Sequence, residues 1–208
     1  VTIRLMDAPL HEFLPHNAGE MKNFLNHLNA GRKTKISQKE VELLSESLHE
    51  FNPMLGHRGV RLGITYPEIT EMQTRAIMEA AVKLAKEGIK VVPEIMIPLV
   101  SDVRELRDQK AVVDRVAKMV IAEQGVRVNY RVGTMIEVPR SVVTAGAIAG
   151  EADFFSFGTN DLTQMVYGFS RDDATKFLKQ YQSRKLIERD QFTHPRGVKA
   201  SERITLNE

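Results

Sequence analysis

The sequence predicts an α/β fold in which parallel strands alternate with helices. Short apolar segments alternate with longer helical stretches over residues 1–181, and the helical stretches are long enough for parallel crossovers. Polar residues follow the predicted strands at their carboxyl ends, where parallel α/β proteins build sites. These features indicate either a (β/α)8 barrel or a doubly wound sheet. The chain lacks Gly-x-Gly-x-x-Gly and Gly-Lys-Ser/Thr motifs, which disfavours the dinucleotide-binding and P-loop forms.

Length and composition indicate one large globular domain, or part of one. The 208 residues are 42% hydrophobic and 27% charged, and the net charge of +2 is too small to suggest a nucleic-acid partner. No apolar run approaches the roughly 20 residues that span a bilayer, so we expect no membrane partner. The absence of cysteine excludes disulfides and thiolate metal sites, and it is compatible with the cytoplasmic location that we expect.

The first strand is predicted over residues 1–5, where Arg4 lies near the carboxyl end. This strand is already under way at the first residue, so we expect the chain to be a segment of a longer protein. Residues 17–50 read as a helical excursion. Within it, Ser37 caps a second helix, and Glu40 three residues later completes a capping box.

Residues 52–62 form a glycine-rich segment that we interpret as a loop or a strand. It contains two arginines, Arg58 and Arg61. The planar guanidinium group binds phosphate and carboxylate through paired hydrogen bonds, so these arginines suit an anionic ligand. A loop with two solvated arginines explains the same residues about as well.

Two long amphipathic helices flank a buried strand. The buried face predicted for the helix over residues 68–87 consists of Ile69, Met72, Ile77, Ala80, Ala81 and Leu84. Residues 91–100 are almost continuously apolar, as expected of a strand covered on both faces. Ser101 or Asp102 then caps a helix that reaches about residue 123. Its predicted buried residues are Val103, Leu106, Val113, Val116, Met119 and Val120.

Two further strands end in polar residues. Residues 131–140 contain a strand with Glu137 near its carboxyl end, followed by a short helix over residues 140–149. Residues 153–164 begin as an aromatic strand, and Gly158 then precedes three polar residues, Thr159, Asn160 and Asp161. A final helix is predicted to start from a cap at Ser170, Asp172 or Asp173 and to reach Tyr181.

Glu137 and Asp161 lie at equivalent ends of consecutive predicted strands, 24 residues apart. Two carboxylates on neighbouring strand ends suit Mg²⁺, which takes one or two protein carboxylates and completes its octahedron with water and substrate oxygens. The same pair could act as a general acid and base. Alternatively, Glu137 pairs with Arg140 or Arg131, and Asp161 only caps a helix.

Three arginines shift this balance towards a ligand site, because Arg4, Arg58 and Arg61 also fall at predicted strand ends or in adjoining loops. Carboxylates that hold a divalent metal, surrounded by arginines, describe a site for a small anion carrying phosphate and carboxylate groups. The metal would polarise a carbonyl or enolate oxygen, and the arginines would hold the phosphoryl group during transfer.

Five motifs in the chain resemble the C-terminal PEP/pyruvate-binding domain of the pyruvate phosphate dikinase family, within the PEP-utilising enzymes. They are RLMDAPLHEF (4–13), NPMLGHRG (52–59), PEIMIP (93–98), GTMIEVPR (133–140) and FSFGTNDLTQ (155–164). The resemblance covers about residues 1–190. It implies a (β/α)8 TIM-barrel fold, incomplete in this chain, with about strands two to six present. Residues 191–208 read as a divergent polar tail.

The resemblance implies a role for each matching residue. Glu137 and Asp161 would ligate Mg²⁺, and both are also candidate substrate-binding residues. Arg4 would bind the substrate phosphate or carboxylate, and Arg58 would support the phosphoryl group, so both are candidate catalytic residues. The remaining substrate contacts would come from three consecutive residues, Gly158, Thr159 and Asn160.

The family reaction converts ATP, phosphate and pyruvate into AMP, pyrophosphate and PEP, and a phosphohistidine on a separate domain carries the phosphoryl group. The resemblance therefore implies pyruvate and PEP as ligands. It also implies the phosphohistidine and nucleotide-binding domains of the full-length enzyme as partners, and a homodimer when the protein is complete.

Two features depart from the family pattern. The family barrel continues to a Cys-Gly-Glu-His-Gly-Gly motif whose cysteine is the acid/base on the enolate carbon, whereas these 208 residues contain no cysteine. They also hold neither the phosphohistidine domain nor the nucleotide-binding domain. We therefore expect negligible dikinase activity from this chain alone. Two alternatives stay open: a fragment of a phosphoenolpyruvate synthase, and a non-catalytic remnant of the domain.

Overall fold

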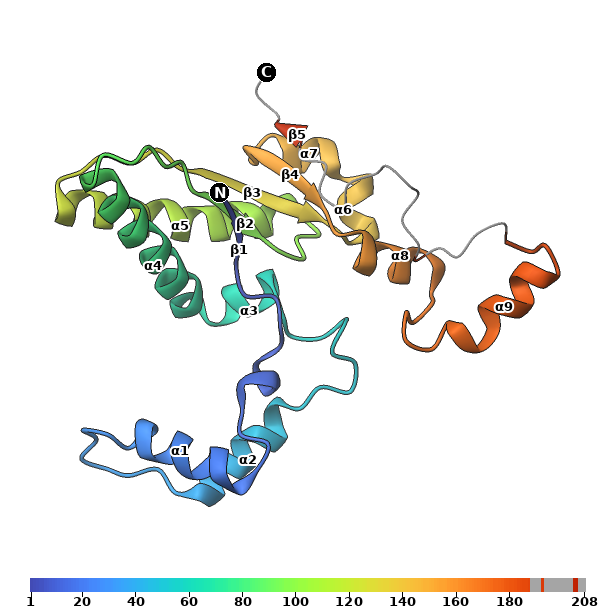
Figure 1. Ribbon diagram of the computed structural model, residues 1–208, viewed down its shortest axis with the longest axis horizontal. Helices are drawn as coiled ribbons and strands as arrows, with labels where there is room; N and C mark the ends of the chain where they lie inside the picture. The colour runs from blue at the N-terminus through green and yellow to red at the C-terminus, as the bar shows by residue number, and fades with distance from the viewer. Residues whose placement is uncertain (188–191, 193–203, 206–208) are drawn as a thin grey trace. The chain divides into compact units, whose positions relative to one another are not determined.

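The computed structural model describes residues 1–187, 192 and 204–205 (Figure 1). The chain divides into two compact units. The first comprises Val1–Asp7 and Gly59–Glu208 and contains the sheet, and the second comprises Ala8–Arg58. Most of the polar tail predicted over residues 191–208 lies outside the described residues, so its divergence from the family stays a prediction.

The first unit is built on a sheet with the strand order β1-β2-β3-β4-β5. Its strands are β1 (Thr2–Arg4), β2 (Glu94–Ile97), β3 (Arg131–Ile136), β4 (Phe154–Phe157) and β5 (Ile204–Thr205). Strands β1 to β4 pair in parallel, and β5 pairs antiparallel with β4. The predicted α/β fold with a parallel sheet is confirmed, and its closure into a barrel stays a prediction.

Helices fill each parallel connection and continue after β4. They are α3 (Val60–Thr65), α4 (Pro67–Lys86), α5 (Val103–Gln124), α6 (Pro139–Val143), α7 (Ala145–Ala149), α8 (Thr159–Tyr167) and α9 (Thr175–Ser183). Local signals explain the long helices. Pro67 occupies the first position of α4, and Asp102 with Glu105 forms a capping box on α5. The predicted ends of both helices are thus correct to within a residue or two.

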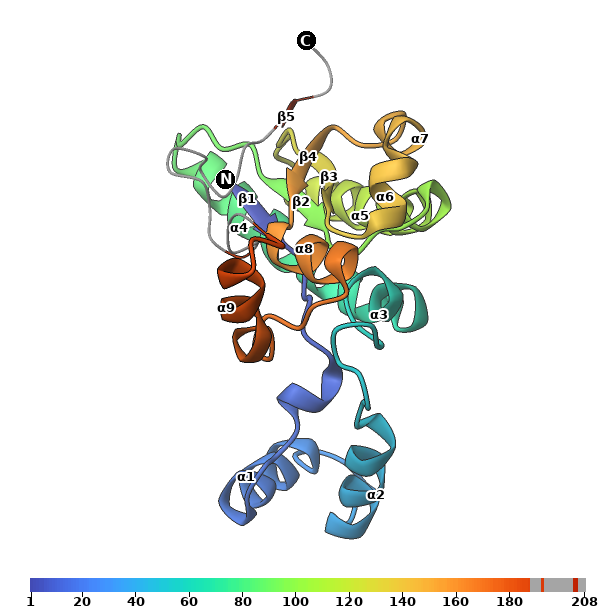
Figure 2. The same cartoon turned by 90° about the vertical axis from the view of Figure 1, so that its right-hand side faces the viewer.

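The core of the first unit lies between one face of the sheet and its helices. Strand residues Ile95, Ile97, Val132, Ile136 and Phe155 pack against Leu106 and Val113 of α5 and Ile148 of α7. A second cluster joins α4 to α5 through Met78, Val82, Val116 and Val120. Helices α6 and α7 lie beside α5 (Figure 2). The helices cover a face of the sheet, and the candidate site residues lie at the carboxyl ends of the strands.

The buried face predicted for α4 is rotated from the observed one by about one residue. Met72 is 63% exposed and Ala80 is also exposed, whereas Thr70 and Thr74 are buried. The physical reason is a polar contact with α5, where the Thr70 hydroxyl donates to Oε1 of buried Gln109 at 2.7 Å. Burial of a hydrogen-bonded threonine follows from its partner, which hydrophobic periodicity does not reveal. On α5, the prediction that Met119 is buried is also wrong.

Three local predictions need correction. The segment predicted as a loop or strand over residues 52–62 ends in helix α3, which starts after Gly59 in a left-handed conformation with φ of 58°. The single helix predicted over residues 140–149 breaks at Thr144, whose hydroxyl donates to the Arg140 carbonyl at 2.9 Å, a bond that bends helices. Finally, Ala174 occupies the N-cap position of α9 in place of the predicted polar caps.

The second unit contains the predicted helical excursion. It consists of a 3-10 turn, η1 (Leu10–Phe13), and two helices, α1 (Ala18–Leu28) and α2 (Gln38–Leu48). The predicted capping box of Ser37 and Glu40 at the start of α2 is confirmed. Within the described part of the chain, no helix combines the length and apolar character needed to cross a membrane.

Candidate functional site

The carboxyl ends of β1, β3 and β4 bring the predicted site residues of the first unit to one edge of the sheet (Figure 1). Arg4 is the last residue of β1, Glu137 follows the last residue of β3, and Gly158 follows the last residue of β4. Because these strands are parallel members of one sheet, their carboxyl ends point the same way. The topology therefore places these three strand ends at the same edge of the sheet, and the roles predicted for the residues there stay predictions.

Glu137 is the buried centre of this edge, with only 2% of its surface exposed. Its Oε1 accepts a hydrogen bond of 2.7 Å from the backbone N–H of Leu99, which follows β2. The pKa of Glu137 is raised to about 7, chiefly by burial and to a smaller extent by the negative charges of Asp7 and Asp161. The Leu99 hydrogen bond and the charge of Arg4 act in the opposite direction.

Gly158 allows the start of α8 to approach Glu137 closely. A Cβ atom at this position would lie 2.4 Å from Glu137 Oε2 and 2.5 Å from Glu137 Cβ. The Gly158 N–H donates to the Ile136 carbonyl at 3.0 Å, which fixes the turn between β4 and α8. A side chain at this position would displace the Glu137 carboxylate, whereas the predicted contact of Gly158 with the substrate stays a prediction.

The first turn of α8 carries the other three predicted residues of this motif. Thr159 and Asn160 are exposed and Asp161 is half-buried. Asn160 donates through Nδ2 to Asp161 Oδ1 at 3.1 Å, and Arg171 donates through Nη1 to Asn160 Oδ1 at 2.8 Å. Backbone N–H groups at the start of a helix favour anions. Sequence reasoning missed Arg171, because no pattern ties this position to the α8 turn.

Arg4 and Asp7 form the β1 side of the site. Arg4 Nη1 lies 3.2 Å from Oδ2 of Asp7, a carboxylate that is almost fully buried. This ion pair leaves part of the guanidinium group exposed. The sequence analysis did not assign a role to Asp7, although its position three residues after a strand-end arginine is a usable signal.

Alternative roles for these carboxylates lose support in the structure. Gly158 occupies the N-cap position of α8, so Asp161 lies inside the helix and is not its cap. Arg140 Nη2 pairs with Asp102 at 3.0 Å, and Arg131 lies 4.0 Å from Glu94. Both arginines predicted as alternative partners of Glu137 thus pair with other carboxylates.

The two carboxylates predicted to bind Mg²⁺ have the chemistry that this ion requires. Glu137 and Asp161 are close enough for their charges to interact, and two carboxylates with water and substrate oxygens make a normal Mg²⁺ ligand set. Among the described residues, no group of three or more His, Cys, Asp or Glu side chains is arranged to hold a metal ion. Glu137 and Asp161 are chemically suitable as the two carboxylate ligands, and the Mg²⁺ site itself stays a prediction.

The other two predicted arginines are placed differently. Arg58 belongs to the unit Ala8–Arg58, where its Nη1 donates to the Met54 carbonyl at 3.5 Å. Its role beside the carboxylates stays a prediction. Arg61 lies in α3 and is half-buried.

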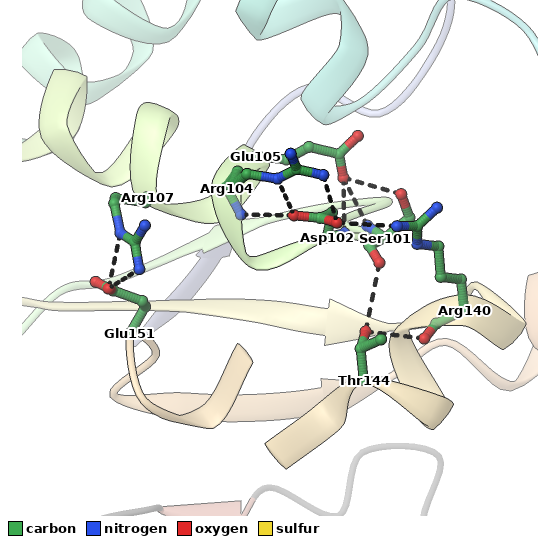
Figure 3. Close-up of polar contacts among 8 residues, drawn as sticks. All are labelled: Ser101, Asp102, Arg104, Glu105, Arg107, Arg140, Thr144 and Glu151. Atoms are coloured by element: carbon green, nitrogen blue, oxygen red, sulfur yellow. Dashed lines mark hydrogen bonds and ion pairs between the residues drawn. The ribbon is translucent and has the colours of Figure 1, made fainter. Parts of the chain in front are cut away.

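An ion-pair cluster at the start of α5 shapes the loop after β2 (Figure 3). Asp102 accepts hydrogen bonds from Arg104 at 2.9 and 3.1 Å and from Arg140 at 3.0 Å, so it ties α5 to α6. The Arg104 hydrogen bonds hold the pKa of Asp102 well below its usual range. Arg107 and Glu151 pair nearby at 2.8 Å and tie α5 to the end of α7. These exposed pairs connect the helices around the site edge.

Comparisons with known proteins give a family match over most of the chain and several similar proteins. Residues 1–194 match the family described as PEP-utilising enzyme, PEP-binding domain. The chain is 54% identical over 193 residues to pyruvate, phosphate dikinase of Clostridium symbiosum, which covers 92% of this chain and 21% of that protein. It is 55% identical over 193 residues to the Rhizobium meliloti (strain 1021) enzyme of that name, with the same coverage.

A plant relative is similar to the same degree. Pyruvate, phosphate dikinase 1, chloroplastic, of Arabidopsis thaliana is 54% identical over 192 residues, which cover 92% of this chain and 20% of that protein. The chain thus spans about a fifth of the length of the curated relatives that it matches.

Proposed function

This chain belongs to the PEP-utilising enzymes through their PEP-binding domain, and from that premise we propose that it binds pyruvate and PEP in a pyruvate, phosphate dikinase. The observation that carries the proposal is the buried Glu137 carboxylate, which lies within electrostatic reach of Asp161 and Arg4 at one sheet edge. Such a combination of acidic and basic groups suits an anionic substrate held with a divalent cation.

Each site residue has a proposed task. Glu137 and Asp161 would hold Mg²⁺, which when bound would stabilise the negative charge of an enolate oxygen. Arg4, oriented by its ion pair with Asp7, would bind the substrate phosphate or carboxylate. The polar first turn of α8 would orient the same ligand through its N–H groups and through the side chains of Thr159 and Asn160.

The proposed reaction transfers a phosphoryl group between a histidine of another domain and the pyruvate enolate. Towards PEP, a methyl proton leaves pyruvate, the enolate oxygen forms a bond to phosphorus, and the nitrogen–phosphorus bond breaks. Arg4, and Arg58 from the loop before α3, would neutralise charge on the moving phosphoryl group. The family places the proton transfer on a cysteine, which these 208 residues lack, so we expect ligand binding without turnover from this chain alone.

Calorimetric titration with oxalate, a planar mimic of the pyruvate enolate, tests the proposal. We expect this chain to bind oxalate in the presence of Mg²⁺ and to lose that binding in Glu137→Ala and in Asp161→Ala. Glu151→Ala is the matched control, because it removes a carboxylate that pairs with Arg107 outside the site. Oxalate binding that persists without Mg²⁺ or in Glu137→Ala would contradict the assignment.

The alternatives make different predictions. A phosphoenolpyruvate synthase would not depend on inorganic phosphate, whereas a dikinase of full length would. The matched relatives are named as dikinases, which favours a dikinase over a synthase. A non-catalytic remnant would bind no oxalate.

We further propose that the phosphohistidine and nucleotide-binding domains of a longer protein, and a second copy in a homodimer, are the partners of this domain. The expected cytoplasmic location stays a prediction.

A further inference from the structure

The loop after β2 contains a strained leucine that lies against the site. Leu99 has φ of 61°, a left-handed conformation that leucine adopts rarely. Among the described residues, Lys185 is the other non-glycine residue with positive φ. Leu99 is fully buried, so its conformation is held by packing. Strained backbone that persists in a core is commonly found where it serves a site.

Neighbouring segments hold this loop in place from both sides. The Thr134 hydroxyl of β3 donates to the Ile97 carbonyl at 2.7 Å, and the Val60 N–H of α3 donates to the Pro98 carbonyl at 3.0 Å. Gly59 packs on the leucine side chain, since a Cβ atom there would lie 2.9 Å from Leu99 Cδ1. The left-handed turn is therefore determined by contacts on either side of it.

The strained turn aims a backbone N–H at the buried carboxylate. The Leu99 N–H donates to Glu137 Oε1 at 2.7 Å, a short distance typical of hydrogen bonds to charged acceptors. The other oxygen, Oε2, lies beside Gly158, next to the first turn of α8. The two oxygens thus have separate environments: Oε1 is held by the backbone, and Oε2 lies beside Gly158 at the start of α8, the helix that carries Asp161.

We propose that Leu99 is a positioning residue, whose left-handed backbone holds Glu137 Oε1 so that Oε2 is the oxygen presented to Mg²⁺. This inference rests on the proposed function of Glu137 as a metal ligand. Groups that hydrogen-bond a ligating side chain orient it, and their loss typically lowers metal affinity about 10–100-fold. The leucine side chain serves to lock the turn, and the backbone N–H makes the functional contact.

An amide-to-ester replacement at Leu99 tests this proposal, because it removes only the N–H. The control is the same replacement at Val132, whose N–H donates to Asp153 Oδ2, also at 2.7 Å. Mg²⁺ affinity is measured calorimetrically on the whole chain. We expect the Leu99 ester to bind Mg²⁺ about 10–100-fold more weakly than the unmodified chain. The Val132 ester should stay within about twofold, because its acceptor is not a proposed metal ligand.

Two further variants separate the possible failures. Leu99→Gly keeps the N–H and adopts positive φ without strain, so its Mg²⁺ affinity should exceed that of the Leu99 ester even though the core loses a leucine. Equal affinities of the Leu99 and Val132 esters would overturn the positioning role. Undiminished affinity in Glu137→Ala would instead overturn the proposed function, because Glu137 would then not be a ligand.

A metal-free measurement tests the contact independently of any ligand. Amide hydrogen exchange of Leu99, followed by NMR, should be slow in the unmodified chain and at least tenfold faster in Glu137→Ala, where the acceptor is lost. Asp153→Ala should leave the exchange of Leu99 unchanged. The same slow exchange in Glu137→Ala would overturn the proposal even in a chain that binds no Mg²⁺.

Discussion

Replacing Glu137 by glutamine should stabilise the metal-free chain at alkaline pH. The folded protein raises the pKa of Glu137 from its ordinary value of 4.5 to about 7, chiefly by burial. Between these two values the folded state binds more protons than the unfolded state, so the free energy of unfolding falls as pH rises through this window. Below pH 4.5 the carboxyl is protonated in both states, and above pH 7 the penalty is complete.

The size of this effect follows from the same two values. At about 1.4 kcal/mol per pKa unit, the shift corresponds to a penalty on the order of 3 kcal/mol at pH 8. Glutamine removes the charge and keeps an oxygen that can accept the Leu99 N–H. Glu137→Gln should therefore be more stable than the unmodified chain at pH 8, by up to that amount, and of similar stability at pH 4.5.

Urea unfolding followed by circular dichroism, with a chelator present, measures the difference at both pH values. Glu123→Gln is the control, because Arg75 hydrogen bonds lower the pKa of this exposed carboxylate and its replacement should not stabilise the chain at pH 8. Addition of Mg²⁺ at pH 8 should stabilise the unmodified chain and leave Glu137→Gln unaffected. A Glu137→Gln effect that is the same at pH 4.5 and pH 8 would refute the reasoning.

Substitutions at three positions test the site and the packing around it. Gly158→Ala should lower Mg²⁺-dependent oxalate affinity at least tenfold, because its Cβ would overlap the Glu137 carboxylate; Gly146→Ala, where a Cβ meets open space, should leave that affinity unchanged. Leu99→Ala should lower the free energy of unfolding by about 2–5 kcal/mol. Leu99→Gly should be no less stable than Leu99→Ala, because glycine tolerates φ of 61°. If urea unfolding shows the glycine variant to be clearly less stable than the alanine variant, the strained conformation is contradicted. Gln109→Leu should cost about 1–3 kcal/mol by leaving a buried threonine hydroxyl of α4 without its acceptor, and an unchanged urea midpoint would contradict that contact.

The parts of the fold that sequence reasoning predicted correctly depend on local signals. The apolar run before Ser101 predicted a buried strand, and β2 lies within it. The capping box at Ser37 and the proline at the start of α4 marked helix starts to within a residue or two. Glu137 was predicted at a strand end because the apolar strand pattern gives way within a few residues to a charged residue and a helix start.

Several features of the site could not be predicted in this way, because they depend on distant partners. Leucine avoids positive φ, so nothing local predicts the Leu99 turn, which contacts around β2 and α3 impose. The buried face of α4 includes Thr70 because Gln109, 39 positions away, provides an acceptor. Asp7 lies near Glu137 because β1 and β3 belong to one sheet, and the sequence alone does not reveal this proximity.

By itself, the sequence determined that strands alternate with helices and that a glutamate and an aspartate follow two consecutive strands, since both are matters of local period and spacing. Only the tertiary structure decided which oxygen of Glu137 is held and which one faces α8. The physical reason is that a carboxylate is oriented by its hydrogen-bond donors, and here the donor is a backbone N–H from a different strand connection, whose position follows from packing.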